Sequence, residues 1–205
     1  SKRIVSQPSG FDVSAEAINP MLFDWQGVIT RWALRRGKAA LFEDCGLGKT
    51  PQQLEWVQHV TAHTQGDAMI FAPLAVAQQT VDEGRKFGVD VNLCRTAKDL
   101  KLGINITNYD RLHHFQNCEF SAIVADESSI LKGQFGVTRQ EITDFASTIP
   151  FRLACTATPA PNDYIELIYH AVFLGIMSEG EIKALFFTQD GNSSNKFRLR
   201  RYAEE

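Results

Sequence analysis

The sequence predicts an α/β fold: a mostly parallel sheet with helices on both of its faces. Short apolar segments, rich enough to be buried strands, alternate along the chain with helical segments of ten or more residues. Parallel strands need such crossovers, and strands buried on both faces read as continuous apolar runs. With 205 residues, 44% hydrophobic and 22% charged, the chain is long enough to bury one core of this kind.

Composition divides the chain into three parts. Residues 1–18 are rich in Ser, Pro and Gly and read as an extended lead-in, 19–175 form the α/β domain, and 176–205 form a helical, basic tail or the start of a linker. The net charge of −3 excludes a wholly basic surface, so any nucleic-acid binding has to be local. The cations of the tail favour a solvated helix face over a phosphate track; they are Lys196, Arg198, Arg200 and Arg201.

Targeting signals and cysteine pairs are not evident in the sequence. No apolar run is long enough to span a bilayer and the first residues lack the apolar core of a signal peptide, so we expect a cytoplasmic protein without a membrane partner. The four cysteines are widely spaced, which predicts free thiols and no structural metal; they are Cys45, Cys94, Cys118 and Cys155.

Each predicted element has a local signal. Asn19-Pro20 supplies a cap and a first helical residue for a helix over 21–36, which Gly37 ends. Further helices are expected at 52–64, 75–87, 110–115, 138–147, 162–174 and 178–187. Strands are expected at 39–42, 68–72, 91–94, 104–107, 121–125 and 152–155, and a flexible polar loop at 189–195.

The stretch Glu43-Asp44-Cys45-Gly46-Leu47-Gly48-Lys49-Thr50 follows the first strand and opens a helix. Its glycines allow backbone N–H groups to close on a phosphate chain, the helix start adds free donors, and Lys49 and Thr50 supply a cation and a hydroxyl for Mg²⁺. The strict phosphate-loop pattern fails at its first position, which holds Glu43 in place of glycine. A glycine hinge beside an exposed lysine is the alternative interpretation.

Two later strands also end on polar residues, Asp126-Glu127 and Thr156-Ala157-Thr158. Ligands of open parallel sheets bind at the carboxyl ends of strands, so these residues are expected to converge on the phosphate loop. A carboxylate pair there suits metal-dependent phosphoryl transfer, whereas a solvated turn would explain the pair alone.

The order of these motifs resembles the first, RecA-like ATPase lobe of superfamily-two helicases, and most closely the SWI/SNF-type translocase branch. Residues 43–50 are similar to that branch's DEMGLGKT with the acids exchanged, and Gln52 matches the glutamine that follows it. Residues 126–132 resemble DEAHxLK but carry Ser128 and Ser129, and 152–162 resemble RLxLTGTPxxN. The serines look most like bacteriophage and prophage members, which implies a bacterial or phage-infected cell.

Three further segments resemble motifs of the same family more weakly. Residues 22–26 resemble an LxxYQ element in which Gln26, 23 residues before Lys49, would read adenine. Residues 72–78 and 106–109 resemble motifs Ia and Ib, which contact the nucleic-acid backbone; the residues concerned are Pro73, Leu74, Gln78, Thr107, Asn108 and Tyr109. An amphipathic helix and ordinary strand ends are the alternatives.

The resemblance implies a role for each matching residue. ATP phosphates and Mg²⁺ would be held by Gly46, Leu47, Gly48, Lys49 and Thr50. Asp126 would hold Mg²⁺ through water and Glu127 would act as the base. Thr156 and Thr158 would couple the nucleotide state to DNA grip, through hydrogen bonds toward Ser128.

A motor of this class needs a second RecA-like lobe, and the 45 or so residues after Pro159 are too few to form one. We therefore expect an N-terminal lobe that acts on double-stranded DNA with its second lobe elsewhere, and that hydrolyses ATP very slowly alone. The lobe of a strand-separating or restriction-type helicase is the first alternative, and a nucleotide-binding docking module is the second.

Overall fold

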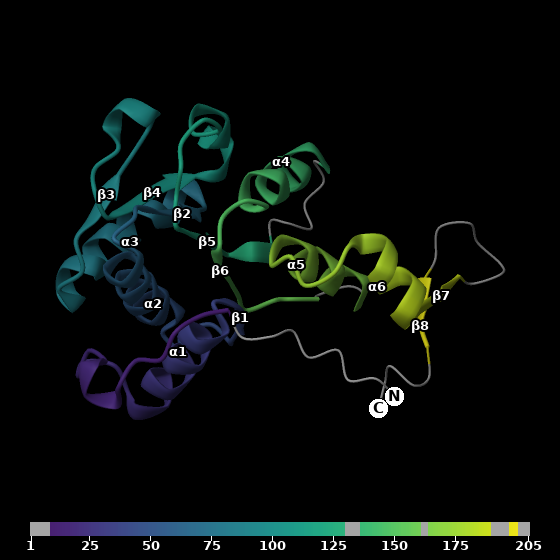
Figure 1. Ribbon diagram of the computed structural model, residues 1–205, viewed down its shortest axis with the longest axis horizontal. Coiled ribbons are helices and arrows are strands. Elements are labelled where there is room, and N and C mark those ends of the chain that lie inside the picture. Colours follow the sequence, from purple (N-terminus) through teal and green to yellow (C-terminus); the bar gives the residue numbers. More distant parts are fainter. Residues whose placement is uncertain (1–8, 130–135, 161–163, 190–196, 201–205) are drawn as a thin grey trace.

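A computed structural model describes residues 9–129, 136–160, 164–189 and 197–200 of the chain. A parallel sheet of six strands forms its centre, in the order β1-β6-β5-β2-β4-β3 (Figure 1). The strands are β1 (Lys38–Phe42), β2 (Ala68–Ala72), β3 (Val91–Leu93), β4 (Ile104–Asn108), β5 (Ala122–Asp126) and β6 (Phe151–Thr156). The predicted fold class is confirmed, and each strand lies within two residues of its predicted bounds.

Helices connect the strands. They are α1 (Asp24–Arg36), α2 (Lys49–Thr64), α3 (Leu74–Phe87), α4 (Gly136–Ala146), α5 (Leu167–Phe173) and α6 (Glu179–Phe186). Short 3₁₀ segments are η1 (Ala15–Ala17), η2 (Ala97–Asp99), η3 (Tyr109–His114) and η5 (Tyr164–Glu166). No helix among the described residues is both long and apolar enough to cross a membrane.

Strand β2 divides the core because its side chains alternate between the two faces of the sheet. Ala68 and Ile70 pack into the cluster that holds Trp56 of α2, whereas Phe71 packs into the cluster that holds Ile142 of α4. Figure 1 shows α1, α2 and α3 on one side of the sheet and α4 on the other. The expectation of helices on both faces is therefore met.

Helix α1 begins three residues later than the Met21 start that the sequence predicts. The Asn19 side chain does not cap it, because Asn19 Oδ1 accepts the N–H of Met21 in a local turn. The helix instead starts where Gln26 Oε1 accepts the N–H of Phe23, 2.9 Å away. A side chain inside the first turn thus sets this boundary.

The lead-in is not simply extended, because it contains η1 and its described part packs on the domain. Backbone N–H groups of Ser9, Gly10 and Phe11 bond to the last carbonyls of α1. The Phe11 ring stacks on His63 with centroids 3.8 Å apart. Residues 9–11 therefore cover the carboxyl end of α1.

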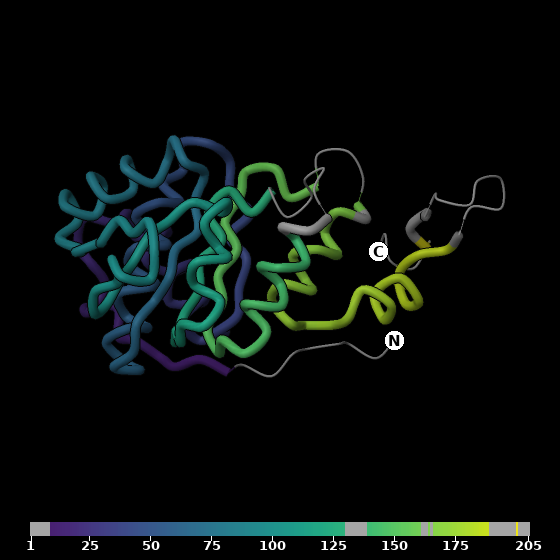
Figure 2. The backbone as a smooth tube through the Cα atoms, turned by 90° about the horizontal axis from the view of Figure 1, so that it is seen from above, coloured from purple at the N-terminus to yellow at the C-terminus, as the bar shows by residue number. Residues whose placement is uncertain are grey.

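The tail differs from its prediction. A 3₁₀ turn and α5 occupy the expected helix at 162–174, and 161–163 lie outside the described residues. The prediction that the tail cations lie on a helix face is wrong for Arg198, which lies on strand β8 (Phe197–Leu199). This strand pairs antiparallel with β7 (Phe187–Gln189). The polar loop predicted at 189–195 lies outside the described residues except for Gln189. Lys196 and Arg201 also lie outside them. Figure 2 shows α6, in yellow-green, projecting away from the sheet.

Candidate functional site

The three loops predicted to converge follow the neighbouring strands β1, β6 and β5. The last residue of β1, Phe42, pairs with Thr156 of β6, and Asp126 of β5 pairs with Cys155. One residue beyond β1, the N–H of Glu43 bonds to the Thr156 carbonyl. Parallel pairing therefore places the phosphate loop, the acid pair and the threonines at one edge of the sheet.

The phosphate loop has the backbone that its glycines allow. Gly46 and Gly48 have φ values of 82° and 79°, in the left-handed region that side chains disfavour. Helix α2 begins at Lys49 rather than at the predicted Gln52, so Thr50 lies in its first turn, among N–H groups that the helix cannot pair. Lys49 Nζ donates to the carbonyls of Glu43 (2.8 Å) and Asp44 (3.0 Å), so its ammonium is held inside the loop.

Glu43, which replaces the first glycine of the strict pattern, ties the loop to α2. Its Oε2 accepts a 2.7 Å hydrogen bond from Nε2 of Gln52, which is fully buried. The same Nε2 also donates to the Gly48 carbonyl. The departure from the motif thus supplies an anchor for the loop, a role that the sequence analysis missed because it treated position 43 only as a mismatch.

Gln26 lies against the phosphate loop, as its spacing from Lys49 suggested. Its buried amide donates from Nε2 to the Leu47 carbonyl, 2.9 Å away, while Oε1 holds the N–H of Phe23. The amide therefore joins the start of α1 to the loop. Contact with adenine stays a prediction, since both ends of this amide already have backbone partners.

Asp126 and Glu127 end β5 in different surroundings. Asp126 is 7% exposed, and its burial raises the pKa of the carboxyl; the neighbouring Gln53 amide, the N–H of Glu127 and the charge of Lys49 oppose this rise. Glu127 has a φ of 49°, which is uncommon for a residue with a Cβ. The two neighbouring carboxylates have different partners: Asp126 Oδ1 accepts the N–H of Glu127, whereas Glu127 Oε1 accepts side-chain hydroxyls.

The Glu127 carboxylate is held by hydroxyls. Its Oε1 accepts hydrogen bonds from Thr156 (2.8 Å) and Ser129 (2.5 Å), and the N–H of Thr158 donates to Thr156 Oγ1. The expected bond from Thr156 toward Ser128 is therefore wrong: the Thr156 hydroxyl reaches Glu127. The strand register explains this, because Thr156 lies one residue beyond the partner of Asp126.

Ser128 points the other way, into the interior. It is fully buried, and its Oγ lies 3.3 Å from Nδ1 of His170 on α5. The His170 ring also packs edge-on against Phe42, with centroids 5.1 Å apart. His170 thus joins the acid loop to the end of β1, a link that no sequence pattern signalled.

The predicted nucleic-acid residues lie at the same sheet edge, but their exposure differs. Pro73 and Leu74 begin α3, Leu74 is 71% exposed, and Gln78 lies one turn further along. Thr107 and Tyr109 are buried, and their hydroxyls bond to the Cys94 and Asp126 carbonyls. Both hydroxyls are therefore already engaged inside the protein, and the nearby Asn108 is only 7% exposed.

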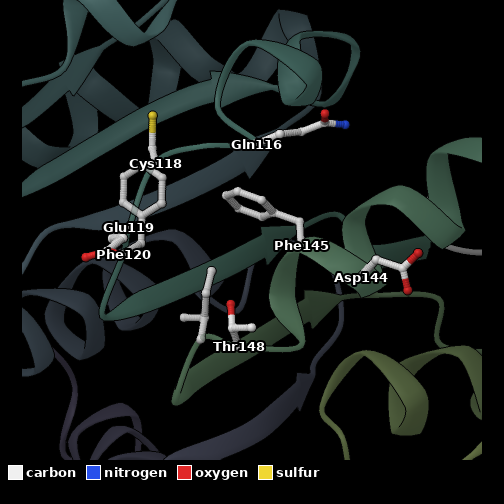
Figure 3. Close-up of a pocket in the computed structure, with 8 residues that line it drawn as sticks. Gln116, Cys118, Glu119, Phe120, Asp144, Phe145 and Thr148 are labelled. Carbon is white, nitrogen blue, oxygen red and sulfur yellow. The ribbon is translucent and has the colours of Figure 1, made fainter.

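A separate hollow of about 490 Å³ lies at the opposite edge of the sheet (Figure 3). Phe120 and Ile149 line it, and they precede β5 and β6 respectively. The phosphate loop follows a strand, whereas this hollow precedes two strands. The two features therefore belong to different ends of the sheet.

No protein-family profile matches the chain, and no curated protein sequence matches it significantly. Solved structures do match. The SWI2/SNF2 ATPase core of Sulfolobus solfataricus in complex with double-stranded DNA is 23% identical, with a TM-score of 0.72 over 85% of this chain and 40% of that chain. The same core domain by itself is 22% identical, with a TM-score of 0.70 over 87% and 42%.

The UvsW helicase of bacteriophage T4 is 10% identical, with a TM-score of 0.61 over 75% of this chain and 57% of that chain. The chain therefore has the RecA-like α/β fold found in SWI2/SNF2 ATPase cores. It spans about two fifths of the length of those cores.

Proposed function

We propose that this chain is the ATP-binding lobe of a motor that couples ATP hydrolysis to movement along double-stranded DNA, and that a second RecA-like lobe completes it. The observation that carries the proposal is that Lys49, which begins α2 after β1, and Asp126 and Glu127, at the end of β5, lie at the same edge of the sheet. The charge of Lys49 also acts to lower the pKa of Asp126. Similarity in fold to a SWI2/SNF2 core in complex with double-stranded DNA supports the choice of substrate.

The residues present fit a magnesium–triphosphate unit. Three features provide complementary groups: the buried carboxylate of Asp126, the ammonium of Lys49, which donates to two backbone carbonyls, and the open space beside Gly46. The described residues contain no group of three His, Cys, Asp or Glu side chains that could bind a metal. Mg²⁺ at such a site takes one or two protein ligands and completes its shell with phosphates and water.

Each residue then has a defined task. The N–H groups of the loop and Lys49 would hold the phosphates, and Thr50 and Asp126 would hold Mg²⁺, which would supply charge neutralisation for the transferred phosphoryl group. Glu127 orients the attacking water and accepts its proton, with its carboxylate fixed by Thr156 and Ser129. Thr156 and Thr158 transmit the state of this carboxylate to the loops that contact DNA.

The lobe should hydrolyse ATP very slowly by itself. In motors of two lobes the arginine finger comes from the partner lobe, and such fingers contribute about 10³ to 10⁵ in turnover. Rapid, DNA-stimulated hydrolysis by this chain alone would contradict the proposal that a second lobe is needed.

Equilibrium binding of a fluorescent ATP analogue with Mg²⁺, compared between the wild type and Lys49→Ala, tests the nucleotide site. We expect Lys49→Ala to weaken binding at least about tenfold, because a charge-assisted contact to phosphate is lost. Equal binding by the two proteins would contradict the motor proposal and favour a docking module. Appended strand-separating or restriction functions would leave this result unchanged, because they share the same nucleotide site.

A further inference from the structure

A second hollow, of about 440 Å³, lies beside the edge strand β3. Strand β3 is the last in the sheet order, so one of its edges has no strand partner within the part of the chain that the structure describes. The loop that carries η2 folds back beside it, and this loop and β3 provide the lining. The lining residues, which we call the β3-edge hollow, are Asn92, Leu93, Arg95, Lys98, Asp99, Leu100 and Lys101.

Three of these seven residues are exposed cations, in a chain whose net charge is −3. Within the described residues, Arg95, Lys98 and Lys101 form no ion pair. Cations elsewhere do: Lys86 pairs with Glu83, and Lys183 pairs with Glu179. The β3-edge hollow therefore gathers three cations, only one of which, Arg95, acts on the carboxylate of the lining, Asp99.

The one carboxylate in the lining is already used by its own loop. Asp99 Oδ2 accepts hydrogen bonds from the N–H of Arg95 (3.0 Å) and from the N–H and hydroxyl of Thr96 (2.8 and 3.2 Å). These bonds lower the pKa of Asp99 and keep it ionised, so its charge organises the loop. With three cations and one carboxylate, the lining of the hollow has a net positive charge.

The loop is held in place by two asparagines, one on β3 and one on β4. Asn92 Nδ2 donates to the Asp99 carbonyl (2.8 Å), and Oδ1 of the fully buried Asn105 accepts the N–H of Lys101 (3.0 Å). The backbone that carries the three cations is thus fixed against β3 and β4. A preformed arrangement loses less conformational entropy when it binds.

Hydrogen bonds also join the loop of the β3-edge hollow to the end of β4. Thr107 Oγ1 donates to the Cys94 carbonyl at 2.9 Å, and Arg111 of η3 donates to the Arg95 carbonyl at 3.3 Å. Arg95 thus lies beside residues 107–109, where the sequence predicts nucleic-acid contact. A further cation, Arg111, thus reaches the Arg95 backbone from η3, the segment that follows β4.

We propose that the β3-edge hollow is a phosphate-contact site that extends the DNA-binding surface from the end of β4 around the free edge of the sheet. The partner is the sugar–phosphate backbone of double-stranded DNA, contacted without regard to base sequence, because unpaired Lys and Arg side chains recognise phosphate charge. The proposal rests on the proposed function, since it names a further part of that motor's DNA surface.

Duplex binding at several salt concentrations tests the proposal. The test variant combines Arg95→Gln, Lys98→Gln and Lys101→Gln; the control combines Arg35→Gln, Lys86→Gln and Lys183→Gln, which removes the same charge from α1, α3 and α6. Binding of a fluorescent duplex of about 20 base pairs is followed by anisotropy. Each lost phosphate contact lowers the slope of log K against log salt by about 0.9, so we expect a reduction of roughly 2 to 3 for the test variant alone.

Affinity at low salt should fall at least about tenfold in the test variant and stay within about twofold in the control. Lys98→Gln alone, on the exposed η2, serves if the triple variant fails to fold, with an expected slope change of about 0.9. Equal weakening in test and control variants would show general charge attraction and overturn the proposal. An unchanged test variant would overturn it too, by placing the DNA elsewhere.

Other outcomes separate this inference from the proposed function. Wild-type protein that binds the ATP analogue but no duplex would overturn both the phosphate-contact site and the DNA half of the proposed function. A wild type that binds duplex with an unchanged test variant would overturn the phosphate-contact site alone. Tighter, hollow-dependent binding of an RNA of equal length would overturn the assignment of DNA as the partner.

Discussion

The hydroxyl of Thr156 donates a 2.8 Å hydrogen bond to Oε1 of Glu127 and so joins the end of β6 to the end of β5. Ser129 donates to the same oxygen, so two hydroxyls fix one carboxylate. A general base is effective only when it is held within reach of its proton, and its contribution is about 10² to 10⁴ in rate. The orientation of Glu127 therefore depends on a residue 29 positions away in the sequence.

Removing the Thr156 hydroxyl should slow hydrolysis without loss of nucleotide binding. For Thr156→Val we expect single-turnover ATP hydrolysis to fall about tenfold, because Ser129 still holds the carboxylate. The dissociation constant of the ATP analogue should change less than about twofold. Thr156→Ser keeps the hydroxyl and should recover most of the rate; equal rates for Val and Ser would show that the hydrogen bond has no role.

Two glycines of the phosphate loop should respond differently to alanine. Both have positive φ, so either substitution costs about 1–2 kcal/mol of folding free energy. A Cβ at Gly46 meets nothing within 4 Å, whereas a Cβ at Gly48 would clash with Nε2 of Gln26. We expect Gly48→Ala to be the less stable protein in urea unfolding and to lose nucleotide affinity, because it displaces Gln26 from the Leu47 carbonyl.

Gly46→Ala should also lose nucleotide affinity, because its Cβ would enter the open space proposed for the phosphates, so folding stability is the measurement that separates the two variants. Similar stability in urea unfolding for the two variants would contradict the proposed bracing of the loop by Gln26.

Asp126 should make stability depend on pH. Burial raises the pKa of its carboxyl, so the folded state holds the proton more tightly than the unfolded state. Its contribution is then most favourable below the ordinary carboxyl pKa of about 4 and is lost as the pH rises through the higher folded value. Asp126→Asn cannot ionise, so we expect its melting temperature near pH 7.5 to exceed that of the wild type by roughly 2 °C or more.

The gain should shrink as the measurement approaches pH 4, and Mg²⁺-dependent hydrolysis should be lost at every pH. Asp110→Asn, at an exposed position of η3, controls for the removal of one negative charge. A gain that is independent of pH, or a gain shared by Asp110→Asn, would refute this account of Asp126.

Arg152 should be important for stability. Its buried guanidinium donates to the carbonyls of Ser147 (2.6 Å), Ile149 (2.8 Å) and Phe173 (2.9 Å), which ties β6 to the end of α5. Arg152→Met leaves these carbonyls without their donor, so we expect a loss of about 3 kcal/mol in urea unfolding. Arg35→Met, on the exposed side of α1, should change stability by less than about 0.5 kcal/mol.

Much of the site was predictable because it depends on chain order and strand direction. Alternating apolar segments predict parallel strands, and parallel strands bring their carboxyl ends to one edge. Lys49 and the pair Asp126-Glu127 were located on this basis, and the structure brings them to one edge of the sheet. The predicted strand bounds lie close to the observed ones because a buried strand is a continuous apolar run in the sequence.

Contacts between side chains from distant elements were not predictable. The bond from Thr156 to Glu127 depends on the register between β5 and β6, and the contact of Ser128 with His170 depends on where α5 packs. The antiparallel pairing of β7 with β8 was missed because short strands have no helical or strand period long enough to detect.

The sequence by itself determined the fold class and the places of the glycine-containing loop and of the acid pair at strand ends, because each is a local pattern that depends only on neighbouring residues. Tertiary structure decided which groups hold Glu127 and Lys49, how deeply Asp126 is buried, and that Arg95, Lys98 and Lys101 surround one hollow. The physical reason is that hydrogen bonds and desolvation depend on distances of a few ångströms between atoms, and only the packing of elements far apart in the chain sets those distances.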